Sequence, residues 1–158
     1  MKIVSLLERG RSLLDHIPYS ALALLARVSA ATVFWRSGET KVDGWTVTQT
    51  TIDLFRDEYR VPIIPPEIAA YMAAIQEHLF AVLLIVGFAS RLSALGLFGM
   101  TAVIQLFVYP DNWPDHILWT SVLLLIVARG PGVLSLDHLL FGWRRDNRPK
   151  DMMLTVAA

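Results

Sequence analysis

Two long apolar stretches of the sequence each contain a single charged residue, and the two charges are opposite. Arg27 interrupts the run over residues 18–35, and Glu77 interrupts the run over residues 68–89. A charge at the centre of a membrane-spanning helix costs roughly 2.5–3.5 kcal/mol on insertion scales. A pair of such charges would either fix the register of two helices, or bind a polar group or move a proton.

The positions of Arg27 and Glu77 also favour contact between them. Each lies about nine residues into its run, so two antiparallel neighbours would place both charges near the middle of a membrane. Small residues share the face of each charge and allow close approach of the helices. They are Ser20, Ala23, Ala30 and Ala31 beside Arg27, and Ala70, Ala73, Ala74 and Ala81 beside Glu77. The sequence therefore predicts an Arg27–Glu77 ion pair.

Further polar residues extend this candidate intramembrane site. His78 follows Glu77 directly and could take a proton, bind a metal ion or simply face a neighbouring helix. Gln105 lies in the third apolar run, where a polar side chain either joins two helices by hydrogen bonds or contributes to a site. The candidate binding site thus consists of Arg27, Glu77, His78 and Gln105.

A second group of candidates lies where the first apolar run ends and the fourth begins. It consists of Glu39, Lys41, Trp113, His116 and Trp119. These residues would form an outer mouth that attracts a polar headgroup or a partner protein. A solvated helix end explains the charges equally well, and an aromatic belt at the membrane surface explains the tryptophans equally well.

Composition excludes several other kinds of site. The chain has no cysteine, which excludes disulfides, thiol chemistry and cysteine-held iron–sulfur or zinc sites. Its net charge is zero, so nothing indicates nucleic-acid binding. His78 and His116 would differ by roughly 15 Å in depth, so one metal ion or haem iron cannot bind both, and neither cofactor is expected. The sequence contains no nucleophile triad, phosphate-binding loop or dinucleotide fingerprint, so catalytic residues are unknown and enzymatic activity stays open.

The elements that must position these residues are membrane helices. The chain is 54% hydrophobic and only 18% charged, whereas average soluble domains are about 25% charged. The apolar runs predict an all-α, four-helix transmembrane bundle with spans at about 18–36, 68–89, 92–109 and 115–129.

Surface helices and tails complete the predicted organisation. An amphipathic helix over residues 1–16 precedes the membrane domain, which covers 17–142, and a basic tail follows over 143–158. Between the first two spans, Ile52, Phe55 and Tyr59 recur at helical spacing. This spacing predicts a short helix lying across the mouth of the bundle.

The positive charges predict how the bundle lies in the membrane. Nine lysines and arginines fall on the side that holds both termini, and four fall on the other side. Because cytoplasmic segments carry the excess of positive charge, we expect both termini in the cytoplasm. The loop over 37–67 and the turn over 111–115 would then face outward, toward the periplasm of a Gram-negative bacterium.

Several short motifs resemble those of the DoxX family of small bacterial membrane proteins. They are the first span with Arg27, followed by Phe34, Gly38 and Lys41; Pro65-Pro66 followed by Glu77; and the turn from Gly87 to Ala94, which contains Arg91. The resemblance covers about residues 18–140. The family pattern carries over to Arg27, Gly38, Lys41, Glu77 and Arg91, and it brings no catalytic roles with it.

The resemblance implies a four-helix protein of the bacterial inner membrane. The family takes its name from a subunit of a thiosulfate:quinone oxidoreductase. Other members are linked to membrane oxidoreductase complexes, to stress defence or to copper-binding peptides. A quinone is therefore a candidate ligand, and a membrane or periplasmic protein is a candidate partner.

Three functions stay open from the sequence. The first is a non-catalytic or co-catalytic subunit of a redox complex, in which Arg27 or His78 would donate to a quinone carbonyl and Glu77 would exchange the proton. The second is a small proton-coupled transporter or exporter, which would have to form a homo-oligomer because four spans are few. The third is an assembly partner of another protein, held in the membrane lipid.

Overall fold

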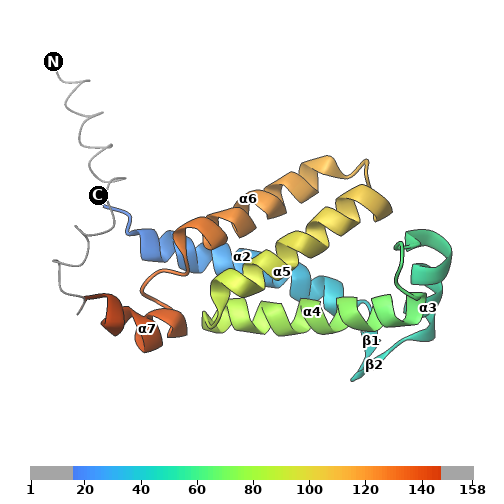
Figure 1. Ribbon diagram of the computed structural model, residues 1–158, viewed down its shortest axis with the longest axis horizontal. Helices are drawn as coiled ribbons and strands as arrows, with labels where there is room; N and C mark the ends of the chain where they lie inside the picture. Colours follow the sequence, from blue (N-terminus) through green and yellow to red (C-terminus); the bar gives the residue numbers. More distant parts are fainter. Residues whose placement is uncertain (1–15, 147–158) are drawn as a thin grey trace, which may run out of the picture.

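Four long helices make up most of the structure (Figure 1). The computed structural model describes residues 16–146, with side chains up to residue 142. The long helices are α2 (Tyr19–Glu39), α4 (Pro66–Val86), α5 (Ser90–Val103) and α6 (Trp113–Arg129). Helices α2 and α5 each pack against both α4 and α6, so the four surround a shared interior.

Shorter segments lie at the two ends of the long helices. At one end are an antiparallel hairpin of β1 (Val42–Asp43) and β2 (Thr46–Val47), α3 (Gln49–Leu54) and the π-helical segment η1 (Phe55–Tyr59). A second π-helical segment, η2 (Ile104–Val108), continues α5. At the other end, α7 (Leu136–Asp146) follows α6 (Figure 1).

Proline and glycine set the boundaries of the long helices. Pro66 lies in the first turn of α4, where no intrahelical N–H donor is needed. The helix ends at Gly87, whose φ of 77° is in the left-handed region that favours glycine. Gly130 ends α6 with a φ of 84° and a ψ of −178°, a backbone conformation that is essentially restricted to glycine.

The observed helices differ from the predicted spans by a few residues at their ends. Helix α2 continues to Glu39 rather than to residue 36, and α4 ends at Val86 rather than at residue 89. The predicted helix around Ile52–Tyr59 is present as α3 and η1. The amphipathic helix predicted over 1–16 and the tail beyond residue 146 lie outside the described residues.

The hairpin is missing from the sequence-based prediction, although its signal is present. Gly44 and Trp45 form the two-residue tip between the strands, and glycine at the first position of such a loop is typical of tight hairpin turns. Gly44 has a φ of 61°, as such turns require. Each strand has only two residues, and the surrounding loop is polar, so the hairpin was not predicted from the sequence.

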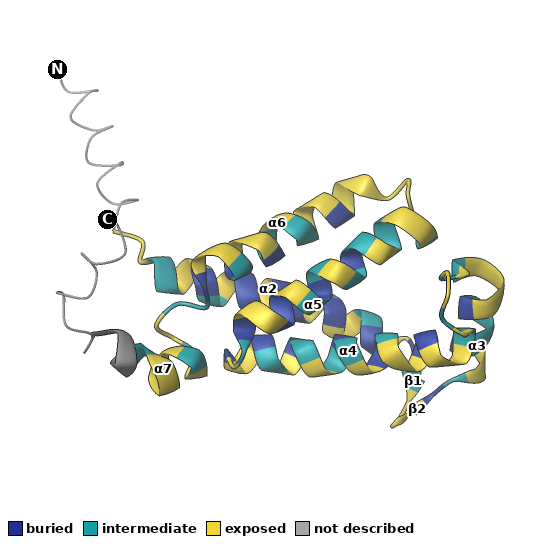
Figure 2. Ribbon diagram, viewed as in Figure 1, coloured by how far each residue is buried: buried dark blue, intermediate teal, exposed yellow. Residues whose placement is uncertain are grey.

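Much of the outer surface of the long helices is exposed (Figure 2), and many large apolar side chains lie on it. Two helical segments, Pro66–Val86 and Ser90–Val108, are long and apolar enough to cross a membrane. Large apolar side chains on them are exposed, among them Ile75 at 59% and Leu92 at 67%. Small residues such as Ala31, Ala81 and Ala94 are instead fully buried between the helices. This inside-out distribution is that of helices packed in lipid.

Arg27 does not pair with Glu77, so the predicted ion pair is wrong. The buried Arg27 guanidinium donates through Nη1 to the carbonyls of Leu84 at 3.0 Å and Ile85 at 3.2 Å. Its Nη2 donates to the carbonyl of Leu134 in the segment after α6. Arg27 thus caps the last turn of α4, where helix carbonyls lack intrahelical partners and the helix dipole favours a cation.

The register of α2 against α4 explains the error. Glu77 lies opposite Gly38, and Gly87 lies opposite Arg27, because a Cβ added at either glycine would meet that neighbour. Ten residues separate Glu77 from Gly87, which is about 15 Å along a helix. The sequence argument counted both charges from the ends of equal spans, whereas α2 extends well beyond the end of α4.

Asp137 from α7 completes the packing at this end of the molecule. Its carboxylate accepts hydrogen bonds from the backbone N–H groups of Ala89 at 2.7 Å and Ser90 at 2.8 Å. These N–H groups open α5, so Asp137 acts as an N-cap supplied by a distant element. The Asp137 N–H in turn donates to the Gly87 carbonyl.

We predict that Arg27→Met strongly destabilises the protein in detergent. Each buried carbonyl left without a donor costs about 1–3 kcal/mol, and Arg27 serves one buried and two partly buried carbonyls. Arg36→Met is the matched control, because Arg36 is an exposed arginine of the same helix. Thermal unfolding should show a large loss of melting temperature for the first variant only. Equal melting temperatures would contradict the capping role.

Candidate functional site

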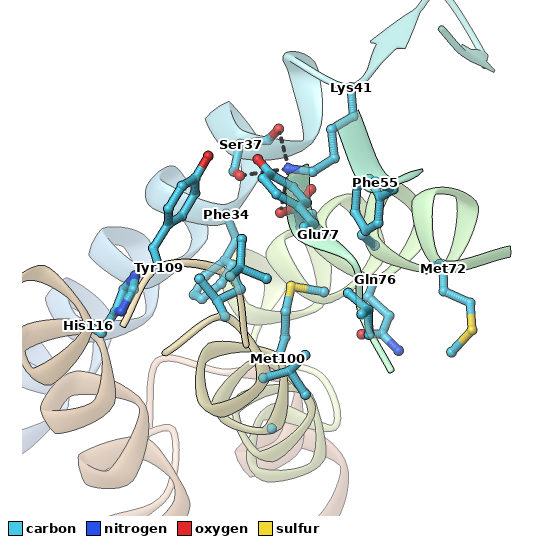
Figure 3. A pocket seen from close by; sticks show the side chains of 18 of the residues that line it. Phe34, Ser37, Lys41, Phe55, Met72, Gln76, Glu77, Met100, Tyr109 and His116 are labelled. Carbon is cyan, nitrogen blue, oxygen red and sulfur yellow. Dashed lines mark hydrogen bonds and ion pairs between the residues drawn. The ribbon is translucent and has the colours of Figure 1, made fainter. Parts of the chain in front are cut away.

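A cavity of about 620 Å³ lies between the long helices, toward the end that carries the hairpin. Its wall is mostly apolar, which is typical of sites for small organic ligands. Figure 3 shows side chains of α2, α4, η1, α5 and α6 around it. Its polar lining comes from Ser37, Lys41, Tyr59, Gln76, Glu77, Tyr109, Asn112 and His116.

A buried ion pair between Lys41 and Glu77 forms part of the cavity wall. Lys41 Nζ lies 2.9 Å from Glu77 Oε1, and only 2% of Glu77 is exposed. Lys41 Nζ also donates to the Ser37 carbonyl at 3.0 Å and to the Ser37 hydroxyl at 2.9 Å. All three N–H donors of the ammonium group are therefore used within the protein.

The other carboxylate oxygen of Glu77 is left without a partner. Glu77 Oε2 is buried and has no hydrogen bond in the described part of the chain. A buried polar atom without a partner is costly, and such atoms require an explanation. Because Glu77 lines the cavity, a ligand with a hydrogen-bond donor would satisfy Oε2 once a small movement of the side chain exposes this atom.

Gly38 lets α2 approach α4 closely enough for this ion pair. A Cβ at Gly38 would lie 2.6 Å from the His78 ring and 3.2 Å from Glu77 Cβ. Any larger residue would push α2 away from Glu77. Gly38 therefore has a packing role next to the site.

The backbone of Lys41 anchors the segment that covers this end of the helices. Its carbonyl accepts hydrogen bonds from Thr48 N at 3.1 Å and from Thr51 Oγ1 at 3.1 Å. These contacts hold β2 and α3 over the end of α2. Lys41 therefore pairs with Glu77 through its side chain and holds β2 and α3 in place through its backbone.

His116 is a second hydrogen-bonding group on the cavity wall. It is 1% exposed, and its Nδ1 donates to Gln105 Oε1 at 2.6 Å. Gln105 Nε2 in turn donates to the Pro110 carbonyl at 2.6 Å. Because Nδ1 carries the proton in this arrangement, Nε2 of the neutral ring is an acceptor.

The two π-helical segments meet at the edge of the cavity. Tyr59 of η1 packs against Tyr109, with ring centroids 5.5 Å apart, and the Tyr109 hydroxyl donates to Glu58 at 2.7 Å. Hydrogen bonding with Tyr59 and with Glu58 raises the pKa of Tyr109, so its phenol stays neutral. π-Helical turns are rare and are frequent at functional sites.

Some residues of α4 and α5 that line the cavity are also exposed on the outer surface. The lining residues Met72 on α4 and Val103 on α5 are 43% and 37% exposed. Gly99 also lines the cavity, and a Cβ placed there would meet nothing within 4 Å. Helices α4 and α5 carry the two membrane-span candidates, so lipid would border this side of the cavity if both helices cross a membrane.

The structure brings together only part of the predicted site. Of the four intramembrane candidates, Glu77 lines the cavity and Gln105 supports it through His116. Arg27 lies at the opposite end of the molecule. His78 lies outside the cavity wall, because its Nδ1 bonds to the Ala74 carbonyl and its ring packs 4.9 Å from Trp35.

The predicted outer mouth is likewise divided. Lys41, His116 and Trp119 line the cavity. Glu39 instead accepts a hydrogen bond from Trp35 Nε1 at 2.9 Å on the surface, and Trp113 is 54% exposed outside the wall. Arg91 lies near Gly130 at the far end.

Sequence reasoning missed Ser37 and Gly99, which contribute to the site without any charge. Ser37 could have been predicted from Lys41, because side chains four positions apart on a helix are neighbours and can form a hydrogen bond. Gly99 had a weaker signal, namely a glycine in the middle of an apolar helix, where it costs stability unless a close approach or an opening requires it.

One comparison with known proteins identifies a family. A family model described as DoxX matches residues 22–110. The chain is also 31% identical over 127 residues to an uncharacterized protein of Haemophilus influenzae, a match that covers 74% of this chain and 82% of that protein. No solved structure matches the chain significantly. The family match includes Lys41, Glu77 and most elements of the cavity wall.

We predict that Lys41→Met destabilises the protein by about 3–5 kcal/mol, because it leaves the Glu77 carboxylate buried without a counter-charge. The double variant Lys41→Met with Glu77→Leu should recover most of that loss, since neither charge remains. Chemical or thermal unfolding in detergent measures both. If the double variant is no more stable than Lys41→Met, the two side chains are not energetically coupled as the structure indicates.

Proposed function

Because this chain belongs to the DoxX family of membrane proteins, we propose that all four long helices cross the bacterial inner membrane. Helices α4 and α5 with η2 meet the length and apolarity of a span. Helix α2 packs along α4, and α6 packs along α5 and α2, so the same lipid layer would surround them. The excess of positive charge beside the termini supports a cytoplasmic location for both ends.

This orientation is testable because the chain contains no cysteine. Trp45, at the tip of the hairpin, is fully exposed, and His138 is exposed on α7. A membrane-impermeant maleimide should label Trp45→Cys in spheroplasts with an intact inner membrane. It should label His138→Cys only after that membrane is opened. The opposite labelling pattern would contradict the orientation.

We further propose that the protein binds a quinone-like lipophilic molecule in the cavity. The observation that carries this proposal is the buried, unpartnered Glu77 Oε2 next to a mostly apolar cavity bordered by the two span candidates. The volume of about 620 Å³ lies within the range of about 300–1,000 Å³ that is usual for ligand pockets. An opening between α4 and α5 would admit the ring from the membrane, with the isoprenoid tail left in lipid.

The fully buried hydrogen-bonding atoms of the wall favour the reduced form of such a ligand. Among them, Lys41 has no free N–H donor, whereas Glu77 Oε2 and His116 Nε2 are acceptors. The amide donors of Gln76 and Asn112 also line the cavity, but these residues are less buried. A quinol has two hydroxyl donors, and a quinone has only carbonyl acceptors. The donors first expected, Arg27 and His78, lie outside the cavity. We therefore propose that the cavity holds the quinol and that Glu77 accepts its hydrogen bond.

Binding of decylubiquinol to the purified protein under anaerobic conditions tests this proposal. Quenching of tryptophan fluorescence is a suitable readout, because Trp119 lies on the cavity wall. The wild type should bind decylubiquinol more tightly than decylubiquinone. Glu77→Gln should weaken quinol binding about tenfold or more, because hydrogen bonds to charged groups contribute about 1.5–3 kcal/mol.

Gly99 provides a matched pair of variants that leaves the ion pair intact. Gly99→Leu would place its side chain in the open space of the cavity and should abolish binding, while Gly99→Ala should retain it. Both variants should keep the melting temperature of the wild type or raise it, since glycine destabilises a helix interior. Unchanged binding by Gly99→Leu would show that the ligand lies elsewhere.

We propose that the protein binds quinol next to a redox partner protein. Trp45 and Ile63 are fully exposed at the hairpin end, and exposed aromatic and apolar side chains are typical anchors for a partner protein. The protein would supply quinol to, or receive it from, a periplasmic or membrane oxidoreductase as a non-catalytic subunit. Proton-driven solute uptake by the protein alone in liposomes would instead favour a transporter.

A further inference from the structure

We propose that the cytoplasmic end of the protein carries a site for the phosphate headgroup of an anionic phospholipid. The site is a second cavity, of about 640 Å³, between the start of α2, the start of α5, the end of α6 and α7. It is separate from the proposed quinol cavity and shares no lining residue with it.

Two arginines converge on this cavity without an acidic partner. Arg91 comes from the first turn of α5 and Arg129 from the last turn of α6, and both line the cavity. Neither forms an ion pair with any residue of the described range. The Arg91 guanidinium packs over Gly130, the residue that follows Arg129, because a Cβ there would lie 3.2 Å from Arg91 Nη2.

Tyr19 holds this arrangement in place. The Arg129 guanidinium lies over the Tyr19 ring, 5.2 Å from its centroid, and the Tyr19 hydroxyl donates to the Gly130 carbonyl at 2.7 Å. The two positive groups are thus kept near one another against their repulsion. An anion between them would relieve that repulsion, and guanidinium groups bind phosphate oxygens in paired hydrogen bonds.

The remaining titratable groups of the cavity do not neutralise the arginines. Asp137 is the one acidic residue that lines it, and both of its oxygens accept hydrogen bonds from the start of α5. His138 is exposed on the rim. Two arginines against one carboxylate leave an excess of positive charge at the cavity, and neither arginine is held in an ion pair within the described residues.

The apolar side chains around the arginines indicate a lipid rather than a free phosphate ion. Leu92 lines the same cavity and is 67% exposed at the start of the lipid-facing surface of α5. Phe141 lines it from α7, where Leu139 and Leu140 are also exposed. An amphipathic helix with such a face lies in the headgroup region of a membrane. A phospholipid would place its phosphate at the arginines and its acyl chains along Leu92.

Lipid selectivity of the full-length protein tests this site. The protein would be exchanged into nanodiscs of phosphatidylcholine and phosphatidylglycerol, and the lipids retained after extraction would be counted by native mass spectrometry. The wild type should retain phosphatidylglycerol in preference. Each of Arg91→Gln and Arg129→Gln should lower that preference about fivefold, as expected for one basic residue at a membrane surface.

A control variant distinguishes binding at this site from a general attraction between basic residues and anionic lipids. Arg36→Gln removes an exposed arginine at the opposite end of α2 and should leave the preference unchanged. If Arg36→Gln lowers the preference for phosphatidylglycerol as much as Arg91→Gln and Arg129→Gln do, the proposal is overturned. If the wild type shows no such preference, the proposal is overturned without any variant. Displacement of phosphatidylglycerol by millimolar glycerol phosphate would also overturn it, because the ligand would then be a soluble phosphate. The quinol assay is independent of all these outcomes.

Discussion

The buried ion pair between Lys41 and Glu77 is the interaction on which the rest of the structure depends. Lys41 joins the end of α2 to the middle of α4 through its side chain and holds the hairpin and α3 through its carbonyl. A buried ion pair repays its desolvation only where the geometry is good and further hydrogen bonds satisfy the charges. Ser37 supplies those bonds to Lys41, and Gly38 gives the pair its space. Only Glu77 Oε2 stays unsatisfied, and it does so on the wall of the cavity.

The two ends of the molecule use charge in different ways. At the cytoplasmic end that we propose, Arg27 and Asp137 satisfy backbone groups at helix ends, so their charges hold the fold together. At the other end the ion pair leaves one acceptor free beside a large apolar space. Charge at the first end therefore supports the fold, although Arg27 Nε and Ser90 Oγ are buried there without a partner. Charge at the second end leaves a carboxylate oxygen unpaired beside the cavity. The π-helical segments η1 and η2 occur only at this second end of the described chain.

The sequence predicted the helices well because apolar runs, prolines and glycines mark their ends directly. It also identified Lys41, Glu77, Gln105 and His116 as polar residues of interest. It could not predict which partner each charge would take, because partner choice depends on helix register, and a shift of a few residues moves a side chain by about 1.5 Å for each residue. Arg27 and Glu77 looked equivalent when counted from span ends, yet α2 and α4 are offset. Ser37 and Gly99 carry no charge and gave little signal until packing placed them on the cavity.

The central claim is that a quinol occupies the cavity beside Glu77. Photochemical labelling of the membrane-embedded protein with an azido-quinone, reduced before illumination and mapped by mass spectrometry, tests this most directly. The account predicts label on lining residues such as Met72 and Met100, and loss of that label in Gly99→Leu. Label confined to lipid-facing residues outside the cavity, such as Leu79 and Leu95, would contradict it.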